Sequence, residues 1–200
     1  MQLVPASPSD AGPAARCFAD AFATDPLIGY FFGDSPAGRA ESAERFFSLL
    51  LRARLAMAMP IVLARHAQGI VGGAMGYSTV RPEWPVQLQH EWAALEAASP
   101  AVADRFAAYE SIAAASEPEG PHYYLGVVGV HPGARGTGTG GALVRAFCER
   151  SFSDPASAGV YLETANPENL GFYAHHGFVE RGSGPLGEGR LWCLFHEHAR

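Results

Sequence analysis

Apolar residues of this 200-residue chain recur at helical spacing through much of its first half. The pattern over residues 9–23 predicts a helix, which we expect to stop at Asp25-Pro26 because the residue before a proline disfavours helical backbone. A second helix is predicted over residues 36–58, with Ser35 as its N-cap. Two alanine-rich segments within 85–115, broken at Ser99-Pro100, predict two more helices.

Strand signals lie between and around these helices. Residues 1–5 predict a short edge strand. Residues 61–65 and 70–80 predict a strand pair that turns around Gln68-Gly69, a sequence typical of a hairpin.

The second half of the chain alternates strands and helices more sharply. Residues 122–130 form an uninterrupted apolar run, as expected of a strand covered on both faces. A helix over 138–152 and a strand over 160–164 follow, so this strand–helix–strand unit should be a right-handed parallel crossover.

A last helix and a strand pair complete the predicted elements. Asn166-Pro167 is a helix-start signal, and the helix should run to His176, where Gly177 ends it. Residues 178–181 and 190–196 predict a strand pair around a glycine-rich loop at 182–189. The order of elements predicts one α/β (α+β) domain over residues 1–200, with a mixed sheet of six or seven strands flanked by helices.

Composition narrows the classes of function. Fourteen basic against twenty acidic residues give a formal net charge of −6, which argues against nucleic acid or an anionic membrane as the main partner. Every basic residue is arginine. The absence of lysine excludes a Walker phosphate loop, a kinase ATP lysine and a Schiff-base mechanism.

The three cysteines are far apart in the sequence and form no CxxC pair. We therefore expect free thiols in a reducing cytoplasm rather than a disulfide framework or a zinc ribbon. The first residues lack the basic and apolar regions of a secretory signal, and the uncharged apolar stretches are too short to span a membrane. The expected location is cytoplasmic.

A glycine-rich loop carries the clearest chemical signal. Residues 135–141 follow the apolar strand and open the next helix. Five of the nine residues in 133–141 are glycine. Backbone amides without side chains can approach a ligand closely, and the helix N-terminus adds partial positive charge. The loop is therefore predicted to hold an anion, most simply a pyrophosphate, with Arg135 beside it.

The same glycines also fit a dinucleotide-binding fingerprint. Gly136, Gly138 and Gly141 have its spacing, and Glu163 lies where an acidic ribose ligand would be expected. However, residues 131–135 separate the loop from its strand, and about 60 residues are too few for the rest of such a domain. A nicotinamide-dependent oxidoreductase is therefore the weaker alternative.

Two sequence blocks resemble a known family. The pattern Arg135-x-x-Gly138-x-Gly140 is similar to the acetyl-coenzyme A loop of the GCN5-related N-acetyltransferase (GNAT) superfamily, and residues 162–178 resemble the second conserved block of that superfamily. Within it, residues 122–180 look closest to the puromycin N-acetyltransferase-like branch. Residues 1–120 resemble that branch only in layout.

The resemblance implies a fold and a division of labour. The fold would be GNAT-like, with a central parallel strand pair that splays apart. Residues 1–120, including a helical insertion at 83–118, would form the acceptor side, and residues 121–200 would bind acetyl-CoA. A backbone amide of the strand at 128–130 would polarise the thioester carbonyl, and the loop amides would bind the pyrophosphate.

The resemblance also assigns site residues. Tyr173 would protonate the departing thiolate as a general acid, and Glu163 is the candidate base or acceptor-orienting group. Tyr173 could instead only pack against Phe178, and Glu163 could be a solvated strand-end carboxylate. The implied cofactor-binding residues are Val128, Gly129, Val130, Arg135, Gly136, Thr137, Gly138, Thr139, Gly140, Gly141, Asn169 and Tyr173.

Weaker candidates surround this set. An acceptor pocket could take residues from among His122, Tyr124, Trp84, Trp92, Tyr109, Glu110 and the cluster Tyr30-Phe31-Phe32, for all of which core packing is the default. The pairs His175-His176 and His196/His198 lack a third ligand at zinc spacing, so no metal is expected.

The sequence therefore predicts an acetyl-CoA-dependent N-acetyltransferase. The acceptor would be an amine of a small molecule, with a cationic one mildly favoured by the net charge. The expected partners are acetyl-CoA and this amine, with no nucleic acid or membrane, in a monomer or homodimer. A non-catalytic coenzyme A-binding module stays open beside the oxidoreductase.

Overall fold

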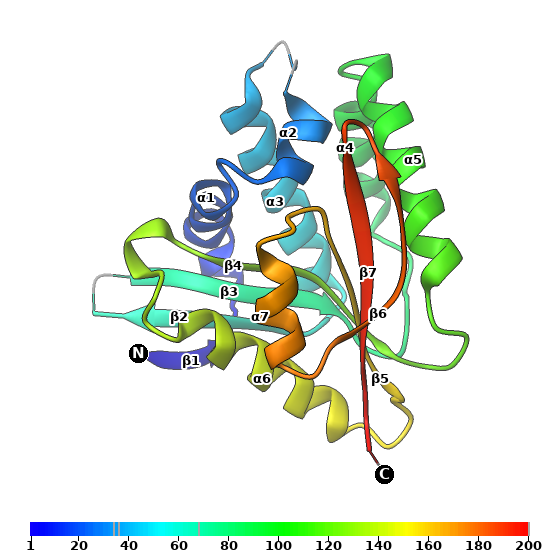
Figure 1. Cartoon of the computed structure of the whole chain (residues 1–200). Helices are drawn as coiled ribbons and strands as arrows, with labels where there is room; N and C mark the ends of the chain where they lie inside the picture. The colour runs from blue at the N-terminus through cyan, green and yellow to red at the C-terminus, as the bar shows by residue number, and fades with distance from the viewer. Residues whose placement is uncertain (34, 36, 68, 200) are drawn as a thin grey trace.

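A computed structural model describes residues 1–33, 35, 37–67 and 69–199. Its strands form a seven-stranded mixed sheet in the order β1-β2-β3-β4-β5-β7-β6 (Figure 1). The strands are β1 (Gln2–Pro5), β2 (Ile61–His66), β3 (Gly69–Tyr77), β4 (Tyr123–Val130), β5 (Gly159–Thr164), β6 (Val179–Leu186) and β7 (Gly189–Glu197). The helices are α1 (Ala11–Ala21), α2 (Pro26–Phe32), α3 (Arg39–Ala56), α4 (Val86–Glu96), α5 (Pro100–Ser116), α6 (Thr139–Phe152) and α7 (Asn169–His175), with single 3-10 turns at Pro8–Asp10 and Pro132–Ala134.

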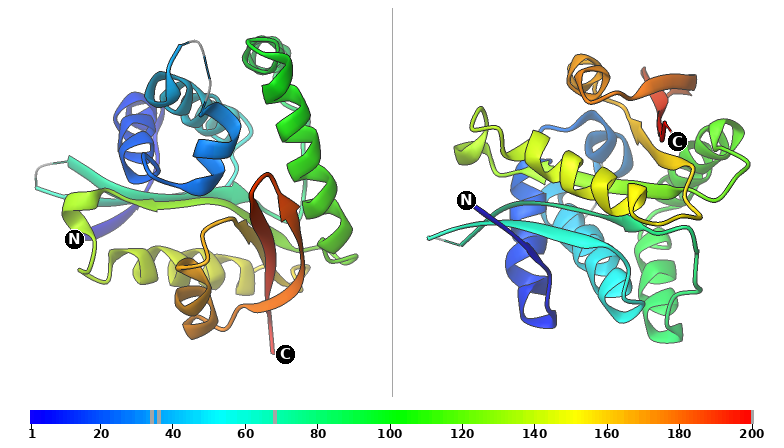
Figure 2. Two further views of the ribbon diagram at one scale, coloured as in Figure 1. Left: turned by 45° about the horizontal axis from the view of Figure 1, so that its top comes forward. Right: turned by 90° about the horizontal axis from the view of Figure 1, so that it is seen from below.

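Helices cover both faces of the sheet. Figure 2 shows α1, α2 and α3 on one face and α6 on the other, with α5 alongside the β6–β7 end. The first face buries an aromatic-rich core that includes Phe18, Phe31, Phe47 and Phe106. The opposite face buries a smaller core around Phe147, between α6, α7 and the sheet. The predicted α/β class, with helices flanking a mixed sheet, is confirmed.

The middle of the sheet is irregular at two places: β4 has a bulge opposite β3, and β4 and β5 separate after a short pairing. Opposite β3, Met75 pairs with Val127 but Tyr77 pairs with Tyr124, so β4 has one extra residue at this point. Gly76 is required here because a Cβ would collide with the carbonyl oxygen of Tyr124. A bulge bends a strand and re-aims its side chains.

The parallel pair of β4 and β5 ends soon after it begins. Tyr123 pairs with Val160 and Tyr124 with Tyr161, and no later residue of β4 pairs with β5 among the described residues. The backbone edge of β4 beyond Tyr124 is therefore left open toward the groove between these strands. The expected splayed central parallel pair is confirmed.

Most predicted elements are present, with shifted ends. The hairpin of β2 and β3 and the helix break before α5 are as expected, while Gln68 lies outside the described residues. The predicted helix over 36–58 begins only at Arg39, and its proposed first residue also lies outside the described part. The helix expected from Asn166 begins at Asn169.

One helix was not expected, and one loop was wrong. The helix predicted over 9–23 ends before Asp25-Pro26, at Ala21. Asp25-Pro26 also starts α2, because the Asp25 carboxylate accepts the Leu27 amide at 2.9 Å and proline suits the first helical position. The glycine-rich stretch 182–189 is mostly strand, and the turn is confined to Gly187 and Glu188. Small residues fit there because α5 packs closely on β6, with Ser116 against Gly182.

Candidate active site

The glycine-rich loop adopts the geometry of an anion cradle. Gly136 and Gly138 have φ values of +74° and +80°, a region that side chains disfavour. Gly138 is the N-cap of α6, and the first helical bond runs from the Ala142 amide to the Gly138 carbonyl at 3.1 Å. The amides of the first turn of α6 therefore have no partners within the helix. A Cβ at Gly138 would project into open space.

A groove of about 420 Å³ runs from this loop to the open edge of β4. Its walls come from β4, the loop and α7. The residues that line it are Val128, Gly129, Val130, Ala134, Arg135, Gly136, Gly138, Thr139, Gly140, Gly141, Asn169, Phe172 and Tyr173. Open backbone beside an anion cradle suits a long ligand that ends in a phosphate.

Thr137 is the predicted cofactor residue outside this lining. Its hydroxyl donates to the Ala134 carbonyl at 2.7 Å and lies 2.8 Å from the Thr139 hydroxyl. The Thr139 side chain is itself buried. These two side chains brace the loop, and its backbone faces the groove. Arg135 donates to the Ala21 carbonyl at 2.7 Å, which ties the loop to the end of α1.

Tyr173 lines the groove. Its ring packs against Phe178 with centroids 5.7 Å apart, so Tyr173 both packs against Phe178 and borders the groove. Burial raises the pKa of Tyr173 well above its ordinary value, and the nearby Asp25 carboxylate adds to the rise. The phenol therefore keeps its proton at neutral pH, as a proton donor must.

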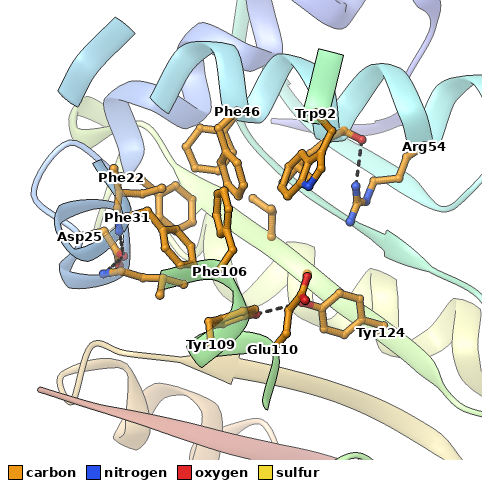
Figure 3. Close-up of a pocket in the computed structure, with 16 residues that line it drawn as sticks. Phe22, Asp25, Phe31, Phe46, Arg54, Trp92, Phe106, Tyr109, Glu110 and Tyr124 are labelled. Carbon is orange, nitrogen blue, oxygen red and sulfur yellow. Dashed lines mark hydrogen bonds between the residues drawn. The ribbon is translucent and has the colours of Figure 1, made fainter. Parts of the chain in front are cut away.

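A second pocket of about 170 Å³ opens on the other side of β4 (Figure 3). Its walls are mainly aromatic, with α2, α3, α4 and α5 each contributing. The aromatic rings that line it are Phe22, Phe31, Phe46, Phe47, Trp92, Phe106, Tyr109 and Tyr124. Its polar side chains are Asp25, Arg54 and Glu110. A small, flat apolar molecule suits such walls.

The aromatic pocket connects two polar regions. Phe22 and Asp25 line both this pocket and a hollow beside Val128 and Asn169, next to the cofactor groove. Tyr109 and Tyr124 line both this pocket and a hollow that contains Glu163. A molecule in the aromatic pocket would therefore have the groove on one side and Glu163 on another.

Glu163 is held by tyrosine hydroxyls near the end of β5. The Tyr109 hydroxyl donates to its carboxylate at 2.9 Å and lies 3.2 Å from the Tyr124 hydroxyl. Burial raises the pKa of Glu163 to about 7, and the hydrogen bonds from Tyr109 and Tyr124 offset part of that rise. A carboxylate whose pKa lies near neutrality can accept a proton and release it again. The solvated strand-end interpretation does not fit this environment.

The weaker acceptor candidates divide by position. Phe31, Trp92, Tyr109, Glu110 and Tyr124 line the aromatic pocket. The others lie elsewhere: Trp84 donates its indole N–H to the Tyr77 hydroxyl at 2.6 Å, His122 is 3.1 Å from the Glu117 carboxylate, Tyr30 lines a separate hollow and Phe32 is in the core.

Arg54 is a functional candidate that the sequence did not reveal. It is 3 % exposed and lines the aromatic pocket, yet its position on α3 follows the apolar periodicity without any motif around it.

The two histidine pairs are not part of a metal site that the structure shows, since the described residues contain no cluster of three or more His, Cys, Asp or Glu side chains suited to an ion. None of the described helices is long and apolar enough to cross a membrane.

Comparison with known proteins decides the family. Residues 101–180 match the family model for the acetyltransferase (GNAT) domain. This chain contains a GNAT acetyltransferase domain. The match covers β4, the loop, α6 and α7, which are the elements that build the groove, and it also covers β5. The GNAT family uses acetyl-CoA as its cosubstrate, and the chain is accordingly an N-acetyltransferase.

Solved structures share the fold over nearly the whole chain. A structure described as histone acetyltransferase HPA2 and related acetyltransferase, from Corynebacterium glutamicum, is 25 % identical with a TM-score of 0.72, covering 100 % of this chain and 97 % of that one. A ribosomal-protein-alanine N-acetyltransferase from Brucella melitensis shares the fold, at 15 % identity and a TM-score of 0.58, over 99 % of this chain and 100 % of that one. An N-acetyltransferase from Staphylococcus aureus is 17 % identical, with a TM-score of 0.58 over 98 % and 100 %.

The dinucleotide alternative is wrong. A doubly wound dinucleotide domain needs a run of parallel strands, whereas the described strands of this GNAT domain have a single parallel pair, β4–β5. The glycines fit the spacing of the fingerprint, but they belong to an anion-binding loop in a sheet of a different topology.

Proposed function

We propose that this GNAT enzyme acetylates the amine of a small apolar molecule by direct transfer from acetyl-CoA, as in the puromycin N-acetyltransferase-like branch. The observation that carries the proposal is the aromatic pocket beside the cofactor groove. Its volume of about 170 Å³ suits a small molecule, and its aromatic walls suit a flat or apolar body. The helical insertion at 83–118 supplies Trp92, Phe106 and Tyr109 to those walls.

The residues around the groove would position the thioester. The loop amides and Arg135 would bind the pyrophosphate, and Asn169 borders the same groove. The open β4 edge would pair with the pantetheine, and the Val128 backbone amide would stabilise the oxyanion that forms on attack. In this arrangement the thioester carbon would lie beside Val128, which lines both the groove and the hollow that Phe22 and Asp25 share with the aromatic pocket.

Two proton transfers complete the reaction. The neutral amine nitrogen would attack the thioester carbon, and the adduct would lose one N–H proton to Glu163, with the Tyr109 and Tyr124 hydroxyls as the path between them. The C–S bond then breaks, and the thiolate takes the proton of Tyr173. The proton taken up by Glu163 passes to solvent, and Tyr173 regains a proton from solvent before the next turnover. The products are an amide and free coenzyme A.

Release of thiol from acetyl-CoA in the presence of an amine panel tests this proposal. We expect release that depends on both enzyme and amine, with equal amounts of thiol and N-acetylated amine. A chain that binds coenzyme A tightly but releases thiol with no amine of the panel would instead be a non-catalytic coenzyme A-binding module.

A further inference from the structure

The guanidinium of Arg54 is buried and forms no ion pair with the residues that the structure describes. Its Nη1 donates to the Leu50 carbonyl of its own helix at 3.0 Å, and its Nε is buried without a hydrogen-bond partner. The guanidinium lies 4.7 Å above the ring of Tyr77. Within the part of the chain that the structure describes, no carboxylate comes within ion-pair distance of it. A buried charge in this state is costly to the fold.

A neighbour on the same helix shows the ordinary alternative. Arg52 forms a two-bond ion pair with the Glu91 carboxylate, at 2.6 and 2.8 Å, near the surface between α3 and α4. Arg54 is two residues further along, but points inward and lines the aromatic pocket. Figure 3 shows it at one end of that pocket, with Asp25 at the other and the aromatic rings between them.

We propose that Arg54 binds a carboxylate of the acceptor, so that the acceptor is an amino acid with an aromatic or large apolar side chain. This proposal rests on the proposed acetyl transfer and names its substrate class. A guanidinium with an unsatisfied N–H matches a carboxylate in geometry and charge, and the ligand would supply the missing counter-ion. The aromatic walls would hold the side chain.

The distance from Arg54 to the proposed thioester contact on β4 agrees with the dimensions of an amino acid. Its Nη2 lies 3.5 Å from the place where a Cβ of Gly126 would be. Gly126 precedes Val128, the proposed thioester contact, by two residues, or about 7 Å along a strand. A carboxylate on Arg54 therefore leaves its neighbouring amine within reach of the thioester.

The acceptor preference of the unaltered enzyme is the first test. L-phenylalanine, phenethylamine, which lacks the carboxylate, and phenylalaninamide, which is uncharged there, are compared by kcat/KM. We expect phenylalanine to be preferred over both by about 10- to 100-fold, the usual value of a charged hydrogen-bonded contact. Acetylation of phenethylamine as fast as phenylalanine would overturn the carboxylate proposal while leaving the proposed function intact.

Binding without chemistry gives an independent readout. 3-Phenylpropionate, which has the carboxylate but no amine, should bind the wild-type enzyme in calorimetry and compete with phenylalanine. Phenylpropionate that does not bind, together with phenylalanine that is not acetylated, would overturn the proposal. Failure of every amine in the panel, charged or neutral, would contradict the proposed function instead.

Variants then assign the preference to Arg54. Arg54→Met should bring the phenylalanine-to-phenethylamine ratio of kcat/KM close to one and abolish phenylpropionate binding. Arg52→Met removes a charge from the same helix and should keep the wild-type ratio. A wild-type ratio in a folded Arg54→Met enzyme would refute the assignment. The comparison of acceptors on the unaltered enzyme decides the proposal even where this variant does not fold.

Discussion

Replacing Glu163 with Gln separates what the buried carboxylate costs the fold from what it contributes to the reaction. The pKa of Glu163 is raised by burial from an ordinary 4.5 to about 7. The folded chain therefore holds more protons than the unfolded chain between these two values, and the free energy of unfolding falls as pH rises through that window. Gln has nearly the same shape, still accepts a hydrogen bond from Tyr109, and does not titrate.

The size of the effect follows from the two pKa values. Between pH 5 and pH 8, a group that shifts from 4.5 to 7 on folding costs the folded state about 2.5 kcal/mol. The stability of Glu163→Gln relative to wild type should therefore rise by about that amount from pH 5 to pH 8. Its kcat/KM should fall about 10²- to 10⁴-fold, the usual contribution of general base catalysis.

Urea unfolding at both pH values and a pH–rate profile make the measurement. Wild-type kcat/KM should rise through about pH 7 as Glu163 loses its proton, and the variant should lack this step. Glu180→Gln, which removes an exposed carboxylate of β6, is the matched control and should resemble wild type. A stability difference that does not change with pH, in a variant that keeps wild-type kcat/KM, would refute both roles of Glu163.

Three further substitutions test other parts of the site. Gly138→Val should raise the Kd for coenzyme A in calorimetry at least about tenfold, because φ is +80° there and the side chain would enter the phosphate space. Gly120→Val, at an open loop position, is its control. Unchanged affinity in folded Gly138→Val would contradict the loop assignment. Tyr173→Phe keeps the ring packing, so Tm should move little while kcat falls about 10²- to 10⁴-fold; wild-type kcat with chemistry rate-limiting would leave Tyr173 a packing residue only. Gly76→Ala should lower Tm far more than Gly120→Ala, because its methyl group would collide with Tyr124; equal Tm values would mean that the bulge can relax.

The second half of the fold was predictable because the local sequence pattern and the tertiary packing favour the same elements there. The apolar run of β4, the glycine loop and α6 follow one another with little interruption, and Gly136 and Gly138 of the loop have the positive φ values that favour glycine. Asp25-Pro26 shows where local reasoning fails. The same two residues end one helix or begin another, and the packing of Phe31 into the aromatic core favours α2.

The acceptor side of the site was predictable only in part. Glu163 and Tyr173 lie in the stretch with recognisable motifs, whereas the hydrogen bond from Tyr109 joins residues 54 positions apart. Arg54 sits in a helix of mixed apolar and charged residues, like Arg52, and only the folded structure distinguishes the paired from the unpaired guanidinium. Contacts between distant segments have no signature in the local pattern.

The most direct test of the central claim is mass spectrometry of the amine after incubation with enzyme and acetyl-CoA. The account predicts an N-acetylated amine that forms in equal amount with free coenzyme A, at a rate that Gly138→Val and Tyr173→Phe both reduce. Coenzyme A binding in the groove without any acetylated amine, across aromatic amino acids and arylalkylamines without a carboxylate alike, would contradict it.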